Sequence, residues 1–268
     1  MAGDKTPRVF LPAEIQFMII DALLQDGCSV ASFATVSREW QVIVERHNFA
    51  RINLTTSRLA DVDSMLRRNR HLVGYLWFRV ELERYDCTKC APSHDWLGSN
   101  MDNVCVATAI QDLFSTLSTW EPNGDLLLDI SVYSPSDSEH WFKYLTFGPD
   151  TPSDQCSWKE IAGQAMLATL VDGRHQHGWY ATCRSHHRAP IEYAIKKVFV
   201  EIMGEGPFDT DEQEGQWWRQ LPLVPAVTGV LLRQQNRRRW KAAALAQMFS
   251  RFPSLREIQY EPWREWDI

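Results

Sequence analysis

The sequence has no uninterrupted apolar run of about 18 residues, the length that a membrane-spanning helix needs. It also lacks a Gly-x-Ser-x-Gly elbow, a Gly-x-x-x-x-Gly-Lys phosphate loop, a Gly-x-Gly-x-x-Gly dinucleotide turn and a His-Glu-x-x-His helix. These absences argue against a membrane protein and against the common hydrolase and nucleotide-binding classes. No cofactor and no catalytic activity of the chain itself are therefore expected, although six cysteines and eight histidines leave open a Cys-His dyad formed in space.

Cysteine is sparse, with six residues spread along 268. The chain is 44% hydrophobic and contains 12 Trp and 12 Phe, which is enough to build the core of one large domain or two smaller ones without disulfides. The N-terminal stretch has no basic leader followed by a small-residue cleavage site. Reduced thiols and a cytoplasmic or nuclear location are expected.

Positive charge is also limited, because 28 Lys and Arg face 34 Asp and Glu and the formal net charge is -6. The overall field therefore gives no reason to expect nucleic-acid or anionic-membrane binding. The one dense basic run comprises Arg233 and Arg237–Lys241. It could be an import signal, a docking patch, or the internal partner of the acidic segment 205–214, but such runs are most often solvated helix faces, and we favour that interpretation.

The N-terminal fifty residues carry a helical pattern. Apolar residues recur at spacings of three and four, namely Leu11, Ile15, Met18, Ile19 and Ala22. Pro12 suits the first turn of this helix, and Asp26-Gly27 ends it. Ser29 can cap a second helix and Ser37 a third. The third helix places Trp40, Ile43, Val44 and His47 on one face. A unit this small cannot bury all these faces on itself, so some of the surface should meet a partner.

This pattern resembles the F-box family in residue type and spacing over about residues 9 to 50. The matching residues are Leu11 to Ile15, Ile19, Leu23, Leu24, Ser32-Phe33, Val36 to Arg38, and Trp40. The resemblance implies docking onto a Skp-type linker protein, which joins a cullin scaffold in an SCF-type ubiquitin ligase. By the same resemblance, the expected linker-binding residues are Leu11, Pro12, Ile15, Ile19, Leu23, Phe33, Val36 and Trp40.

The rest of the chain repeats a helix, a polar turn and a strand. The residues Met65-Leu66, Leu72, Tyr75 and Trp77 have the same mutual offsets as Met248-Phe249, Leu255, Ile258 and Tyr260. A third unit spans 106–132, with a helical stripe and an alternating strand around the turn at Pro122-Asn123-Gly124. Further elements are expected at 158–171 (helix), 198–202 (strand) and 227–232 (strand).

These units are similar to a degenerate leucine-rich repeat, as in fungal-type F-box adaptors. The expected fold class is α+β, with a three-helix F-box module (1–54) followed by an irregular α/β, leucine-rich-repeat-like solenoid (55–268) that binds an unknown target protein. The segments 84–104, 133–157, 172–190 and 204–216 are expected to be long loops, either ordinary surface loops or target-contacting ones.

Two clusters have metal-ligand residue types. Cys87, Cys90, His94 and Cys105 could hold zinc, although ordinary reduced cysteines are the more frequent outcome of such a pattern. His175, His177, Cys183, His186 and His187 form the second, less specific cluster. The alternative to an adaptor is a self-contained scaffold or hydrolase-like domain in which the N-terminal helices are internal core.

Overall fold

The computed structural model describes residues 11–26, 29–85, 96–122, 124–137, 179–181, 188–190, 201–204, 206–233, 236 and 238–261. This part of the chain is mixed α/β, with six α-helices and a parallel sheet. None of the helices within these ranges has the length and hydrophobicity that crossing a bilayer would require.

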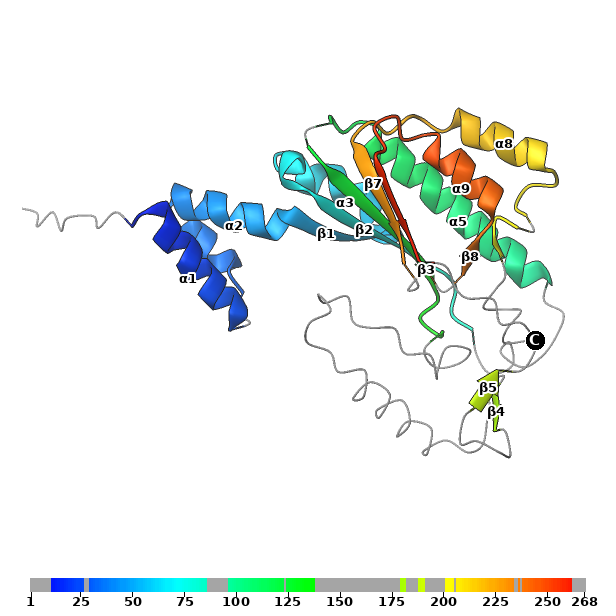
Figure 1. Cartoon of the computed structure of the whole chain (residues 1–268), viewed down its shortest axis with the longest axis horizontal. Coiled ribbons are helices and arrows are strands. Elements are labelled where there is room, and N and C mark those ends of the chain that lie inside the picture. Colours follow the sequence, from blue (N-terminus) through cyan, green and yellow to red (C-terminus); the bar gives the residue numbers. More distant parts are fainter. Residues whose placement is uncertain are drawn as a thin grey trace, which may run out of the picture.

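Three helices form the N-terminal module: α1 (Ala13–Gln25), the 3-10 helix η1 (Ala31–Thr35) and α2 (Arg38–Ala50). The predicted cap of the third helix is confirmed, because the Ser37 hydroxyl accepts a hydrogen bond from the Trp40 backbone N–H at 3.3 Å. The predicted Ser29 cap is wrong, since Val30 precedes η1 and no side chain caps it. The module lies at one end of the molecule, and α2 leads directly into the sheet (Figure 1).

The module has a small hydrophobic core separate from the main one. Its buried members are Ile20, Val30, Ile43 and Val44. The face that α1 buries is not the predicted stripe, because Gln16 and Ile20 are buried whereas Ile15, Met18 and Ile19 are exposed. Gln16 can be buried because its amide donates to the Leu11 carbonyl at 2.8 Å. Since α1 is apolar on more than one side, burying one side leaves the predicted stripe facing outward.

Five parallel strands form the main sheet, and their spatial order equals their order in the chain. They are β1 (Arg51–Thr55), β2 (Tyr75–Glu81), β3 (Leu126–Tyr133), β7 (Val227–Leu232) and β9 (Glu257–Tyr260). The helices α3 (Thr56–Leu66), α5 (Trp96–Leu117), α8 (Asp211–Gln220) and α9 (Ala242–Phe249) lie on one side of it (Figure 1). Parallel strands need such crossover connections.

The core between the sheet and these helices confirms two predicted units. In the 106–132 unit, the helical stripe Ile110, Leu113, Phe114 and Leu117 and the strand residues Leu126, Leu128, Ile130 and Val132 are all buried. The predicted strand 227–232 coincides with β7. The other predicted pair of repeats is out of register by one residue. Ile258 lies in the row of Val230 and Leu76, whereas Glu257 lies in the row of Tyr75, and a slip of one residue moves a side chain to the other face.

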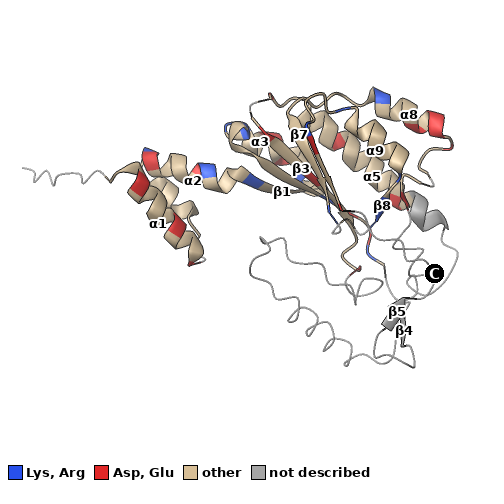
Figure 2. Cartoon of the chain, viewed as in Figure 1, with Lys and Arg blue, Asp and Glu red and all other residues tan. Residues whose placement is uncertain are grey.

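Two predicted loops are partly helical. Within 84–104, α5 begins at Trp96, and within 204–216, α8 begins at Asp211. The Thr210 hydroxyl accepts from the Gln213 N–H at 3.2 Å, and three acidic residues in the first turn complement the helix dipole, so α8 has a strong N-terminal signal despite its polar sequence. The charge colouring shows an acidic start and a basic end of α8 (Figure 2).

Several other predicted elements lie largely outside the described residues. They are the helix at 158–171, most of the loops 133–157 and 172–190, and residues 198–200 of the predicted strand. Two short pairs are described: β4 (Trp179–Ala181) with β5 (Arg188–Pro190), antiparallel, and β6 (Glu201–Ile202) with β8 (Arg239–Trp240), parallel.

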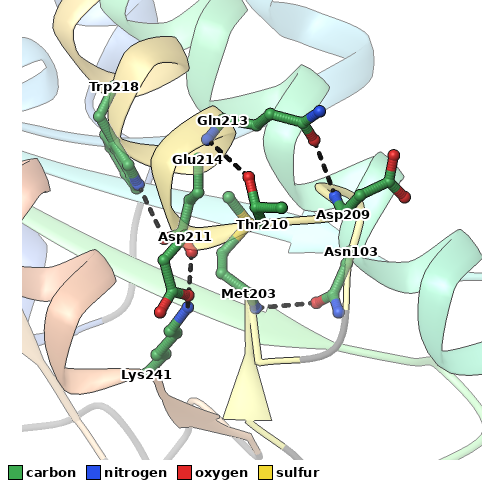
Figure 3. A network of polar contacts seen from close by, with 9 residues as sticks. All are labelled: Asn103, Met203, Asp209, Thr210, Asp211, Gln213, Glu214, Trp218 and Lys241. Atoms are coloured by element: carbon green, nitrogen blue, oxygen red, sulfur yellow. Dashed lines mark hydrogen bonds and ion pairs between the residues drawn. The ribbon is translucent and has the colours of Figure 1, made fainter.

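The basic run is not a solvated helix face. Its described part contains β8, and Arg238 is only 7% exposed and lies 3.4 Å from the Asp137 carboxylate. Lys241 contacts Asp211 at 2.6 Å and Glu214 at 2.7 Å, and Glu214 also accepts from the Trp218 indole N–H (Figure 3). Asp211 and Glu214 of the acidic segment are therefore internal partners of Lys241, as the alternative interpretation held for the run. Arg238 can be buried because the fixed Asp137 carboxylate compensates its charge.

Candidate binding surfaces

The eight linker-binding positions expected from the sequence divide into two groups. The first group is solvent-exposed and comprises Pro12, Ile15 (41% exposed), Ile19 (36%) and Val36 (64%). The second group is half-buried and comprises Leu11, Leu23, Phe33 and Trp40. Three further apolar residues of the module are exposed but were not among the expected linker-binding positions, namely Phe17 (44% exposed), Met18 (66%) and Val42 (53%).

The half-buried group supports the exposed one. Leu23, Phe33 and Trp40 pack against the module's small core, and the rings of Phe33 and Trp40 lie 6.1 Å apart. Substituting Trp40 would therefore disturb the module itself. The positions that can be changed without removing core are Ile15, Met18 and their exposed neighbours.

The exposed apolar residues give the module a surface suited to a partner. Monomeric proteins rarely expose several large apolar side chains on one small unit, because each loses favourable burial. Much of α1 is uncharged in the charge-coloured view (Figure 2), and the charged residues within α1 are the acidic Glu14 and Asp21. A partner for this face would be apolar at its centre.

A second surface lies on the face of the main sheet opposite to α3, α5 and α9, which we call the far face. Alternate residues of each strand point away from these helices. The far-face residues of β1 to β3, aligned by the strand registers, are Arg51, Asn53, Thr55, Tyr75, Trp77, Arg79, Glu81, Leu127, Asp129, Ser131 and Tyr133. Their rows combine aromatic rings with guanidinium groups.

A buried carboxylate organises the centre of the far face. Asp129 is 0% exposed, and its Oδ2 accepts a hydrogen bond from the Tyr75 hydroxyl at 2.5 Å and another from Arg233. Arg233 also donates to the Tyr75 hydroxyl oxygen at 3.1 Å. Burial, the hydrogen bond to Asp129 and the charge of Asp129 raise the pKa of Tyr75 well above its ordinary value. This phenol therefore stays protonated as a donor.

Three arginines at the far face lie on aromatic rings, and one of them, Arg233, has its guanidinium carbon 5.3 Å from the Trp77 ring centroid and is also paired with Asp129. The Arg79 guanidinium carbon is 4.6 Å from the centroid of the Trp77 ring and 4.5 Å from that of Tyr133. The Arg51 guanidinium carbon is 4.5 Å from the Tyr75 ring. The Trp77 indole N–H donates to the Ser131 hydroxyl oxygen at 2.8 Å, which fixes the ring beneath Arg79. Cation–π contacts hold these charges in place without neutralising them.

This cluster was not predicted from the sequence. Tyr75 and Trp77 served only as markers of a repeat, and the long loops, read as ordinary surface loops or as target-contacting ones, were the candidate contact sites. The usable signal was the alternation in Tyr75–Glu81, where every second residue is aromatic or charged and the intervening residues Leu76, Phe78 and Val80 are fully buried. The partners from β3 and Arg233 could not be assigned without the sheet order.

Replacing Tyr75 by phenylalanine is expected to lower the free energy of unfolding by about 1–3 kcal/mol, because the buried Asp129 carboxylate loses a donor. Urea denaturation followed by tryptophan fluorescence measures this. The matched control is Tyr133→Phe, whose hydroxyl donates at 3.1 Å to the exposed Glu81 and whose loss should cost less. Equal costs for the two variants would contradict the central role of Asp129.

Only one of the four candidate zinc ligands lies within the described residues. Cys87, Cys90 and His94 lie outside them, as do the members of the second, His-rich cluster. Cys105 is half-buried on α5, and its thiol donates weakly to the Glu81 carbonyl at 3.9 Å. Burial, with the nearby carboxylates of Asp102 and Glu83, raises the pKa of this thiol. Within the described ranges, no group of three or more metal-ligating side chains occurs.

Comparisons of the chain with protein-family models, with curated proteins and with solved structures found no significant match.

Proposed function

We propose that this chain is an F-box-type substrate adaptor of a cullin-RING ubiquitin ligase, with the N-terminal module docking onto a Skp-type linker. The observation that carries the proposal is the division of apolar residues within the module. Ile20, Ile43 and Val44 form a core of its own, while Ile15 and Met18 remain exposed. An N-terminal segment that merely completed a larger fold would turn such residues inward.

The proposed target-binding part is the remaining α/β region, arranged as a leucine-rich-repeat-like solenoid. Support comes from the parallel sheet, whose strands follow one another in chain order with helices on one side. In a solenoid each unit packs only against its neighbours, which leaves a continuous sheet face for a ligand. The far face, with its rows of side chains around Asp129, is the proposed contact surface.

The adaptor itself catalyses nothing in this proposal. It would hold a target protein beside a ubiquitin-loaded enzyme, so that transfer becomes effectively intramolecular and the effective concentration of the target rises. A compartment shared with the ubiquitin machinery, cytoplasm or nucleus, is part of the same proposal.

Isothermal titration calorimetry of the full chain with a purified Skp-type linker tests this. We expect sub-micromolar affinity and a negative heat-capacity change, because the contact would bury the apolar residues of α1. The absence of detectable binding by the folded chain would reject the adaptor function and favour a self-contained scaffold or hydrolase-like domain.

A further inference from the structure

We propose that the far face binds acidic residues of an extended target segment through Arg51 and Arg79. This inference deepens the proposed target-binding function and rests on it. The two guanidinium groups are held on aromatic rings, Arg51 on Tyr75 and Arg79 between Trp77 and Tyr133. They form two fixed positive charges on neighbouring strands.

The charges of Arg51 and Arg79 are not compensated by a carboxylate in the part of the chain that the structure describes. Arg233 differs, because Asp129 accepts a hydrogen bond from it. The Arg79 Nε atom is buried and has no hydrogen-bond acceptor within the same described part. Four other Nε atoms share this property, those of Arg70, Arg233, Arg239 and Arg251. A ligand is therefore favoured by the charges of the Arg51 and Arg79 guanidinium groups, to which a carboxylate could form charge-assisted hydrogen bonds.

The spacing of the two arginines fits an extended peptide. Arg51 is in register with Tyr75, and Arg79 is in register with Thr55, four residues further along β1. This separation is about 13 Å along the strand direction at about 3.3 Å per residue. In an extended segment, side chains four residues apart project from the same face at a similar distance. Two acidic side chains with three residues between them would therefore match both guanidinium groups, with Trp77 between them.

The surroundings favour discrete carboxylates over a nucleic acid. The whole chain has a net charge of -6, and Glu81 and Asp129 occupy the same face as Arg79. A polyanion would meet this repulsion along its whole length, whereas two carboxylates placed over Arg51 and Arg79 avoid it.

The first test is selection of a displayed library of random twelve-residue peptides on the full chain. We expect enrichment of Asp or Glu at positions four apart, and loss of this enrichment on the variant Arg51→Gln/Arg79→Gln. The matched control, Arg58→Gln/Arg256→Gln, removes two exposed arginines of α3 and of the segment preceding β9 and should leave the enrichment unchanged. Selection without acidic enrichment, or with the same enrichment on the Arg51/Arg79 variant, would overturn the proposal.

A second variant covers the case in which the double substitution unfolds the chain. Arg79→Lys retains the charge but loses the planar group that stacks between two rings. One selected peptide, synthesised and labelled, should bind this variant at least tenfold more weakly than the wild type in fluorescence anisotropy. Unchanged affinity would count against the stacked guanidinium.

Three further binding measurements distinguish the alternatives. A peptide analogue with phosphoserine in place of Glu that binds more than tenfold tighter would assign the site to phosphate instead of carboxylate. Displacement of the peptide by a single-stranded oligonucleotide at equal concentration would assign it to nucleic acid. Titration with the Skp-type linker separates the two proposals, because linker binding without peptide selection rejects only this inference, and peptide selection without linker binding rejects only the adaptor function.

Discussion

Replacing Ile15 and Met18 by glutamate is expected to weaken binding of a Skp-type linker by at least about 100-fold while leaving the chain folded. Each side chain would contribute about 1.5–3 kcal/mol through burial at the interface, and each glutamate would also have to be desolvated there. In the free protein both positions are solvent-exposed, at 41% and 66%, so the substitutions remove no core. Calorimetry gives the affinity, and thermal unfolding checks the fold.

The matched control is Met65→Glu/Met101→Glu, which places the same charges on exposed apolar positions of α3 and α5, at 42% and 62% exposure. This variant should bind the linker as the wild type does. A loss of affinity shared by both variants would show that added negative charge, and not the α1 surface, is responsible. Retained binding by the Ile15/Met18 variant would remove α1 from the interface.

The sequence predicted elements best where one period dominates. The stripe from Ile110 to Leu117 and the strand 227–232 have clear helical and strand patterns, and both were located correctly. The polar sequence of α8 has only a capping threonine and acidic first turn to indicate a helix, so 204–216 was assigned as a loop. Helix α1 shows a different limit. Its apolar residues lie on several sides, and only the neighbouring η1 and α2 determine that Gln16 and Ile20 are buried.

The two candidate surfaces also differ in how far they could be predicted from the sequence. Residues of the N-terminal module are close in sequence, so the resemblance to the F-box family over one short stretch was enough to group Ile15, Ile19 and Val36 as candidates. The far-face cluster joins Tyr75 to Asp129 and Arg233, which are 54 and 158 residues away. Such partners depend on strand order and register, and a register error of one residue, as between Tyr75 and Ile258, reverses which face a side chain occupies.

Replacing Asp137 by alanine is expected to lower the free energy of unfolding by about 3–5 kcal/mol, the largest stability effect that we predict for a single substitution. The Asp137 carboxylate is 0% exposed and accepts hydrogen bonds from the Tyr85 hydroxyl at 2.8 Å and the Ser134 N–H at 2.9 Å. It also lies 3.4 Å from Arg238. Burial alone would lower the pKa of Arg238, and the charge of Asp137 reverses this and raises it. Urea denaturation measures the loss.

A second substitution distinguishes two causes of the lost stability, namely the buried charge of Arg238 without Asp137 and the lost hydrogen bonds to Asp137. In Asp137→Ala/Arg238→Met the buried cation is removed as well, so part of the lost stability should return, because loss of Asp137 takes away a close compensating charge from Arg238. The control Asp125→Ala breaks an ion pair with Arg256 in which the two side chains are 83% and 74% exposed, and it should change stability by less than about 1 kcal/mol. If the double variant were less stable than Asp137→Ala, Arg238 would be stabilising the fold through contacts other than Asp137. The buried Arg238 of the basic run would then stabilise the fold independently of Asp137.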